Sequence, residues 1–436
     1  MFPYLLYLTF TVSYFLRFPS RYPILADFRI DFVLSVIIFL GIVLTGRLHR
    51  LRHPNDKVTP RLLLLIGYIV ITVPFVEWPG SVVRFGLEKL AKVVVFYFFT
   101  ICLLDTEDRL KTFFYIFFGC QVFRIFEPIH LHVTTGYWGS SAYTRIGGES
   151  ALLRLSGAPH DVINPNQLAW VILTTSIFLF YLLLTKRGVS GRCVRFALLA
   201  TFGYGFVLTG SRSGFLTLLV LVPAMLYLSE RRLNTALTIG LISLPLLLLL
   251  GRVLTPELAI RYLSLFDPTL PGGDTAAGRL HGLSSTLVTL ANNPLLGNGL
   301  GTSQETNWNL SQSGQISHNL YIEIFQELGL VGFGLFFSFV FRTIRLLQLT
   351  RTRTRIPSRN EDFINRLATA TQAWAIMNLF YGLASFGLTS WEWYLTGGLS
   401  VACARISRVT DPTGERTANT SLKSQPASVN GSCQQE

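Results

Sequence analysis

The chain contains few charged residues. Asp, Glu, Lys and Arg make up 14% of its 436 residues, whereas soluble domains have roughly 25%. Hydrophobic residues reach 50%, and 34 Phe, 16 Tyr and 7 Trp are present. This balance excludes an ordinary soluble domain. It is typical of a polytopic membrane protein, in which some aromatic side chains form belts at the two membrane interfaces.

Cysteine and metal-binding patterns are also scarce. The five cysteines are scattered and form no Cys-x-x-Cys pair: Cys102, Cys120, Cys193, Cys403 and Cys433. Such spacing supports neither a disulfide framework nor a zinc site. An Asp-x-Asp motif is absent as well. We therefore expect no metal and no cofactor.

The formal net charge is +13. In a soluble protein this excess would suggest a nucleic-acid partner. In a membrane protein it fits Lys and Arg residues that fix the orientation of cytoplasmic loops. We therefore expect a lipid bilayer, and no nucleic acid, as a partner.

Apolar runs recur along the chain, and a spanning helix needs about 20 mostly apolar residues. We expect about twelve spans, near 3–16, 31–46, 61–77, 90–104, 112–127, 167–185, 194–209, 214–228, 235–251, 319–341, 367–387 and 389–405. The first run lacks the basic stretch and cleavage site of a signal peptide, so we interpret it as a span. The fold class expected is all-α: a polytopic helix bundle over residues 1–408, followed by a disordered cytoplasmic tail, 409–436.

Three basic segments, 47–61, 186–195 and 342–359, fall on one side of such a bundle, together with both termini. The positive-inside rule makes that side cytoplasmic. Three arginines on the other side weaken this assignment: Arg17, Arg21 and Arg29.

The remaining polar segments, 128–166, 210–213 and the long loop 252–317, then lie outside the cytoplasm. ATP and nucleotide sugars are not available there. An enzyme that works on this side needs a substrate already activated on a carrier.

The first candidate motif, Thr209 to Gly214, interrupts two apolar runs and contains Arg212. A charge at membrane depth usually faces a partner or a water-filled site, so Arg212 could grip phosphate oxygens. It could equally reach out to lipid headgroups. Upstream, Asn164-Pro165 starts a turn and Asn166 can cap the following helix; a substrate contact from Arg154 or Asn166 is the alternative.

The long loop carries two further candidates. In Gly278-Arg279, the arginine side chain could contact an anion or face solvent. The stretch from Asn292 to Gly301 is rich in glycine, and its backbone N–H groups could face an anion or simply connect two elements.

His318 stands where the apolar run 319–341 begins. The helix N-terminus disfavours an imidazolium, so the imidazole could accept a proton as a general base. Glu323 and Glu327 lie one turn apart on the same helix. They could orient His318, pair with an arginine, or serve as structural partners.

Together these motifs resemble the O-antigen ligase family, the membrane glycosyl-transfer proteins that include O-antigen ligases and Wzy-type polymerases. The family's ligases carry His, then Asn, Ser or Gln, nine residues, Gly, two residues, and Gly, Thr or Tyr. Here this motif stands as His318-Asn319, Gly329 and Gly332. The other family patterns match at Ser211-Arg212-Ser213-Gly214, Gly278-Arg279, Pro294-Leu295-Leu296-Gly297-Asn298-Gly299 and Asn164-Pro165-Asn166. The similarity covers about 150–340 strongly.

The resemblance implies a GT-C-like helical fold and a metal-independent reaction. The implied donor is a glycan on undecaprenyl diphosphate, and the implied acceptor is a hydroxyl of lipid A-core or of another lipid-linked glycan. Arg212 and Arg279 match the arginines expected to bind the diphosphate, and His318 matches the expected catalytic histidine.

The chemistry agrees with these roles. Attack at an anomeric carbon expels a diphosphate, and two guanidinium groups in a low-dielectric cleft could stabilise its charge by several kcal/mol. His318 would take the acceptor proton, and Asp267 and Asp274 remain alternative bases.

We therefore predict an O-antigen ligase-like glycosyltransferase at the outer face of the cytoplasmic (inner) membrane. The predicted catalytic residues are His318, Arg212 and Arg279, and the predicted substrate contacts are Arg212, Arg279, Arg154, Asn166 and Glu323. The alternatives are a Wzy-type polymerase of O-antigen, capsule or exopolysaccharide, a protein O-oligosaccharyltransferase, and a transporter of lipid-linked sugars.

Overall fold

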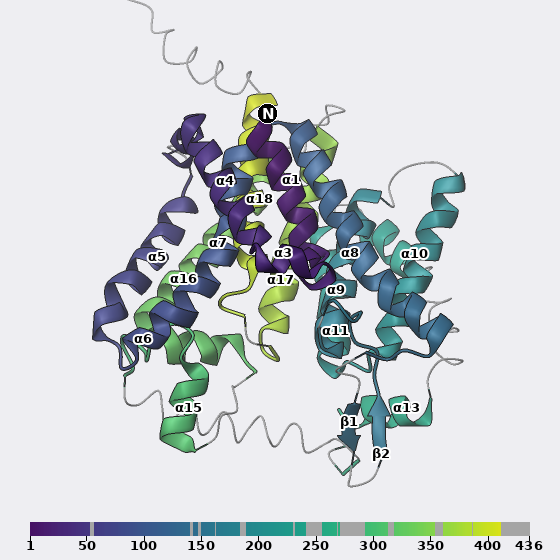
Figure 1. The fold of residues 1–436 in the computed structure, drawn as a ribbon. Helices are drawn as coiled ribbons and strands as arrows, with labels where there is room; N and C mark the ends of the chain where they lie inside the picture. Colours follow the sequence, from purple (N-terminus) through teal and green to yellow (C-terminus); the bar gives the residue numbers. More distant parts are fainter. Residues whose placement is uncertain are drawn as a thin grey trace, which may run out of the picture.

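The computed structural model describes residues 1–52, 56–139, 143–146, 150–161, 163–183, 189–229, 232–240, 255–267, 269–270, 293–312, 318–353, 361–385 and 387–410. Over these residues the chain is a bundle of helices with one short hairpin (Figure 1). The predicted tail lies outside the described residues, except that helix α18 continues to Thr410.

The helices, in chain order, are α1 (Phe2–Phe15), α2 (Phe18–Arg21), α3 (Pro23–Asp27), α4 (Ile30–Leu44), α5 (Thr59–Thr72), α6 (Pro79–Ser81), α7 (Leu87–Leu103), α8 (Glu107–Thr135), α9 (Pro165–Phe178), α10 (Val189–Leu208), α11 (Arg212–Leu228), α13 (Pro256–Leu263), α15 (Ser303–Ser311), α16 (Leu320–Arg353), α17 (Glu361–Tyr381) and α18 (Trp391–Thr410). Shorter 3-10 and π segments are η1 (Arg47–Arg52), η2 (Val73–Phe75), η3 (Val82–Gly86) and η4 (Leu179–Leu183). Strands β1 (Tyr143–Ile146) and β2 (Ser150–Leu153) pair antiparallel, with Tyr143 opposite Leu153.

Most of each predicted apolar run lies on a helix. The run 235–251 is helical as far as residue 240, and its remainder lies outside the described residues, as do residues 184, 185 and 386 of two other runs. Two differences stand out. Helix α8 continues eight residues past the expected end at 127, through Pro128 to Thr135, and the β1–β2 hairpin is an exception to the all-α expectation. Neither feature carries a long apolar run, so hydropathy could not indicate it.

The outer surface of the bundle is apolar. Helix α4 buries only a narrow stripe, Leu34, Ile38 and Ile42, while Phe39 is 53% and Leu40 is 51% exposed on its other faces. A helix in a soluble protein would place polar side chains there. By length and composition, Pro165–Leu183 and Leu320–Thr352 could each cross a membrane, and four shorter apolar helices accompany them: Ile30–Leu44, Thr59–Phe75, Val194–Leu208 and Arg212–Leu228.

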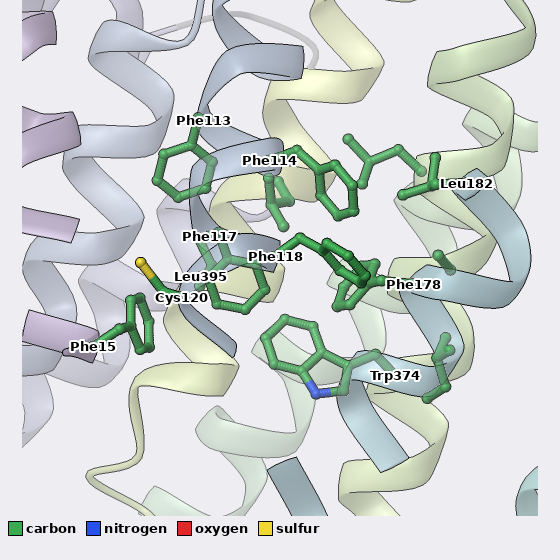
Figure 2. Close-up of a cluster of buried hydrophobic side chains, with 14 of the residues drawn as sticks. Phe15, Phe113, Phe114, Phe117, Phe118, Cys120, Phe178, Leu182, Trp374 and Leu395 are labelled. Atoms are coloured by element: carbon green, nitrogen blue, oxygen red, sulfur yellow. The ribbon is translucent and has the colours of Figure 1, made fainter. Parts of the chain in front are cut away.

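The interior is packed with aromatic side chains contributed by distant helices (Figure 2). The ring of Phe117 on α8 meets Phe15 on α1 edge-on, with centroids 5.1 Å apart. Phe178 on α9 meets the fully buried Trp374 on α17 in the same way, at 5.5 Å. Such pairs contribute about 0.5–1.5 kcal/mol beyond their buried area. This core fixes α9 and α17, whose ends carry the site described below.

Ion pairs gather at the two ends of the bundle. At the end where the N-terminus lies (Figure 1), Asp105 binds Arg50 at 2.7 Å and also pairs with Arg47 and Arg109. At the other end, Arg21 donates to Glu127 at 2.7 Å, and Asp161 pairs with both Arg17 and Arg124. Two of the three arginines that weakened the orientation assignment are therefore held by carboxylates.

The Arg124–Asp161 pair is buried, at 2.6 Å. We expect Asp161→Asn to lower stability by about 3 kcal/mol, because it leaves the Arg124 guanidinium buried beside an uncharged partner. The unfolding midpoint in detergent should fall clearly. Asp27→Asn, at an exposed position of α3, is the matched control, and an equal effect of the two substitutions would contradict the assignment.

Candidate functional site

The site is built around the turn that joins α10 to α11. Gly210 adopts a left-handed conformation with φ 52°, which glycine tolerates best. Ser211 then caps α11, because its side chain accepts a hydrogen bond from the Gly214 amide at 3.1 Å. The turn therefore places Arg212 in the first turn of α11, at the end of the bundle that also carries the hairpin and α13 (Figure 1).

The turn is tied to the segment that precedes α9. Arg154, which is 5% exposed, donates from Nε to the Thr209 carbonyl at 2.8 Å and from Nη2 to Oδ1 of Asn166 at 2.7 Å. The same Oδ1 accepts from the Ser211 hydroxyl at 3.0 Å. Arg154, Asn166 and Ser211 thus form one hydrogen-bonded network that joins two of the sequence motifs.

The cap of α9 lies two residues before the one that the sequence suggested. Asn164, not Asn166, caps the helix, and it forms a capping box with Gln167. A capping box satisfies two otherwise unpaired N–H groups reciprocally. Asn166 is consequently available to Arg154 and Ser211.

Helix α13 covers the turn from the outside. Arg261, 6% exposed, donates from Nε to the Gly210 carbonyl at 2.8 Å. Arg212 donates from Nη1 to the Ser264 hydroxyl at 2.9 Å. The Tyr262 ring packs 5.6 Å from that of Phe215 on α11. The loop helix is thus docked onto the arginine turn by three separate contacts.

Two arginine side chains, Arg261 and Arg154, therefore lie beside Gly210. A methyl group placed on Gly210 would stand 3.4 Å from Cδ of Arg261 and 3.6 Å from Nε of Arg154. Burial, together with the positive charges of Arg261 and Arg212, lowers the pKa of Arg154 to about 9. The side chains of three arginines therefore influence one another in this region.

His318 is exposed and immediately precedes the cap of α16. Asn319 caps the helix, because its Oδ1 accepts from the amides of Tyr321 and Ile322 at 2.9 and 3.2 Å. The motif's second residue thus has a structural role. It holds the imidazole at a fixed distance from the helix start.

The end of α17 links this helix start to the arginine network. The Leu320 amide donates to the Gly382 carbonyl at 2.8 Å. The adjacent Tyr381 hydroxyl donates to the Asn166 carbonyl at 2.9 Å. The first turn of α16 and the Asn166 network therefore dock on two adjacent residues of the chain, Gly382 and Tyr381.

The two carboxylates of α16 bind backbone amides. Glu323 accepts from the amides of Gly387 and Leu388 at 2.6 and 3.1 Å. Glu327 accepts from the Gly301 amide at 2.7 Å and from the Ser303 hydroxyl at 2.6 Å. Of the three roles considered for these carboxylates in the sequence analysis, the contacts fit that of structural partners.

Helix α16 is interrupted at Gly329, which has φ 64° and ψ −169°. Backbone groups released by the break pair with the glycine-rich loop. The amides of Asn298 and Gly299 donate to the carbonyls of Gln326 and Glu327, both at 2.9 Å, and the Leu330 amide donates to the Pro294 carbonyl at 2.9 Å. The loop therefore runs along the break as a short ladder.

The contact leaves no room for side chains. A Cβ atom on Gly329 would lie 2.3 Å from the Leu295 carbonyl oxygen, and one on Gly297 would lie 2.5 Å from the Gly329 nitrogen. The Tyr68 hydroxyl closes the same region by donating to the Leu328 carbonyl at 2.8 Å. The Gly301 amide of this loop donates to the Glu327 carboxylate of the protein itself.

Some predicted residues cannot be compared. Arg279, Gly278 and Asp274 lie outside the described residues. Asp267 is exposed, and hydrogen bonds from the Thr269 side chain and amide lower its pKa, which makes it a weaker base. Among the described residues, no group of three or more His, Cys, Asp or Glu could hold a metal ion.

The sequence interpretation overlooked Arg261 and Tyr381. Arg261 lies three residues after the buried Leu258 on a helix that begins Thr255-Pro256, so an arginine on the buried face of a loop helix was the available signal. Tyr381 ends an otherwise apolar helix and carried no signal of its own.

Residues 196–337 match the family model described as O-Antigen ligase. The matched range begins in α10, includes the turn and α13, and ends within α16. No curated protein matches the chain. The match agrees with the resemblance found in the motifs: over this range, which is less than half of the chain, the sequence is similar to the O-antigen ligase family.

The break in α16 yields a direct test. Gly329→Ala should lower the unfolding midpoint in detergent, because the backbone conformation alone costs about 1–3 kcal/mol for a residue with a side chain and the new methyl group meets the Leu295 carbonyl. Gly334→Ala is the matched control on the same helix, where an added Cβ meets nothing within 4 Å. That substitution should leave stability unchanged or raise it by about 0.5–1 kcal/mol. Equal midpoints for both variants would rule out the interlocking contact.

Proposed function

We propose that the protein is a membrane glycosyltransferase that moves a glycan from undecaprenyl diphosphate onto an acceptor hydroxyl at the outer face of the cytoplasmic membrane. The observation that supports this most is a chain of hydrogen bonds that connects three of the sequence motifs at one end of the bundle. Arg154, Asn166 and the Ser211–Gly214 turn share a hydrogen-bonded network, and the start of α16 docks on the same end of α17.

In this proposal the acceptor oxygen attacks the anomeric carbon of the donor sugar. The new carbon–oxygen bond forms as the bond to the diphosphate breaks, and the diphosphate leaves with the electron pair. Arg212 and Arg279 bind its oxygens, because a planar guanidinium fork matches phosphate geometry. The displacement inverts the anomeric centre, and no metal ion is required.

His318 acts as the base that takes the acceptor proton. Its place beside the Asn319 cap and its exposure support access to an incoming hydroxyl. A positioned base contributes about 10²–10⁴-fold. Arg154 and Asn166 serve as substrate contacts or hold the turn for them. We assign Glu323 to holding residues 387 and 388 beside the site.

The membrane arrangement that goes with this activity has about twelve spans, a GT-C-like bundle over 1–408, and an outer loop over 252–317. The basic segments and the tail lie in the cytoplasm. Two observations support it: the polar motifs share one end of the bundle, and Arg17 and Arg21 on that side are paired with carboxylates.

The acceptor separates two versions of the activity. A ligase would use a lipid A-core hydroxyl, and a Wzy-type polymerase would use another lipid-linked glycan. Deleting the gene and analysing the cell's glycans distinguishes them. Full-length polymer accumulating on its lipid carrier indicates a ligase, single repeat units indicate a polymerase, and a normal glycan profile contradicts both.

His318→Ala should reduce transfer at least 100-fold, because the acceptor proton loses its base, while insertion and the unfolding midpoint stay as in the wild type. The measurement is undecaprenyl diphosphate release by the purified protein. His160→Ala, at an exposed outer position, is the control. Retained turnover in His318→Ala would remove this imidazole from the mechanism, and absence of any lipid diphosphate release by the wild type would favour a transporter.

Arg212→Lys should be severely impaired in the same assay, since a point charge does not reproduce a two-pronged fork. Normal turnover would contradict the diphosphate contact.

Treatment with EDTA should leave the wild-type rate unchanged, and a loss restored by Mg²⁺ would contradict metal independence.

A further inference from the structure

Helix α7 and the π segment η3 before it carry charged side chains on an exposed face. Arg84, Glu88 and Lys92 follow one another at intervals of four residues, so they share one side of the helix, and Lys89 lies beside them; all four are exposed. We call these four residues the charged stripe. The stripe is set in an apolar surface, because η3 and the helices packed against α7 expose the following side chains: Val83, Phe85, Val33, Val36, Ile37, Val70 and Ile71.

Two cations of the stripe have no carboxylate at salt-bridge distance. Lys92 binds Glu88 at 2.6 Å, so this pair is neutral. The Arg84 guanidinium lies 5.4 Å from the centroid of the Phe85 ring, and Lys89 acts only at longer range on carboxylates of α16. Within the described ranges, neither Arg84 nor Lys89 forms an ion pair. Because a cation on an apolar, membrane-facing surface usually faces a partner, these two side chains indicate an anion supplied from outside the chain.

The stripe lies close to the helix that begins after His318. Gly86 packs so tightly on the glycine-rich loop that a Cβ atom there would lie 2.2 Å from the Leu300 carbonyl oxygen. The next loop residue, Gly301, donates to Glu327 on α16 at 2.7 Å. The arginine turn is connected to α16 by a different route, through α17, and Figure 1 shows α6 and α13 on opposite sides of α17. The stripe and the arginine turn therefore approach the start of α16 from different sides.

We propose that the charged stripe binds the phosphate groups of the acceptor lipid, and that its occupant is lipid A. The inference rests on the proposed function, in which the arginine turn holds the donor diphosphate and the acceptor needs a contact of its own. The acyl chains lie on the exposed apolar side chains, and the phosphates meet Arg84 and Lys89.

The spacing of the two cations favours lipid A over a polyprenyl diphosphate. Arg84 and Lys89 are five residues apart, which is about 7.5 Å along a helix axis. Lipid A carries two separate phosphates, one at each end of its disaccharide, whereas a diphosphate is a single compact group. Two separated cations therefore match two separated phosphates, each through a charge-assisted hydrogen bond.

The test measures lipid affinity by the shift of the unfolding midpoint of the purified full-length protein in detergent. The probes are lipid A with both phosphates, the same lipid with its phosphates removed, and phosphatidylglycerol as an ordinary anionic lipid. The wild type should bind lipid A at least about tenfold more tightly than either of the others. The double substitution Arg84→Gln, Lys89→Gln should remove most of that preference, because both phosphates lose a charged partner. Its midpoint without lipid should stay near that of the wild type, since both side chains are exposed.

Two single substitutions make the test more specific. Glu88→Gln should tighten lipid A binding, because it removes the negative charge of the stripe and releases Lys92 for a phosphate; a purely structural stripe predicts no such gain. Lys57→Gln is the matched control, since Lys57 is an exposed lysine just before α5, at the other end of the bundle, and its lipid A affinity should equal that of the wild type. Every variant should keep wild-type affinity for undecaprenyl diphosphate, which the arginine turn holds.

Wild-type lipid A affinity in the double variant would overturn the inference, and so would a wild type that binds phosphatidylglycerol or the dephosphorylated lipid equally well, because the stripe would then contact ordinary membrane lipids. Loss of undecaprenyl diphosphate binding in the double variant would overturn lipid A as the occupant and assign the stripe to a polyprenyl diphosphate. The proposed function has its own readout. A protein that binds lipid A as expected but releases no undecaprenyl diphosphate would support the lipid site and contradict glycan transfer.

Discussion

The break in α16 at Gly329 is the constraint on which the site end of the molecule depends. In a continuous helix these carbonyls and amides would form hydrogen bonds with one another. The break releases the carbonyls of Gln326 and Glu327 and the amide of Leu330, and these groups take up the loop from Pro294 to Gly299. Buried backbone groups must be paired, so the loop and the break each supply the hydrogen-bond partners that the other requires. The two glycine patterns of the family's motifs are thereby explained by a single contact.

A second set of contacts organises the arginines. Arg154 links the segment before α9 to the turn after α10, and α17 joins that network to the helix that follows His318. None of these partners is adjacent in the sequence. The buried aromatic contacts of α8, α9 and α17 hold the helix ends in place (Figure 2), which is how an apolar core far from the polar groups determines where they lie.

Much of this could be predicted from the sequence. Long apolar runs predicted the helices, because burial or lipid exposure requires them, and the match over residues 196–337 agrees with the resemblance that the motifs indicated. Finer features could not be predicted, because they depend on tertiary contacts. Asn164 rather than Asn166 caps α9, since Gln167 completes a capping box. The partners of Glu323 and Glu327 include backbone amides that only the folded chain brings near, and the Gly210 carbonyl that Arg261 contacts lies 51 residues away in the sequence.

The ion pairs of Arg17 and Arg21 have a consequence for how the chain is made. Arg21 leaves the ribosome 106 residues before its partner Glu127, and Arg17 leaves 144 residues before Asp161. In the membrane arrangement proposed above, the first helices would therefore enter the bilayer with unneutralised positive charges, which favour retention on the cytoplasmic side. The orientation proposed for the first spans would then be stabilised only after α8 and the segment before α9 have been synthesised.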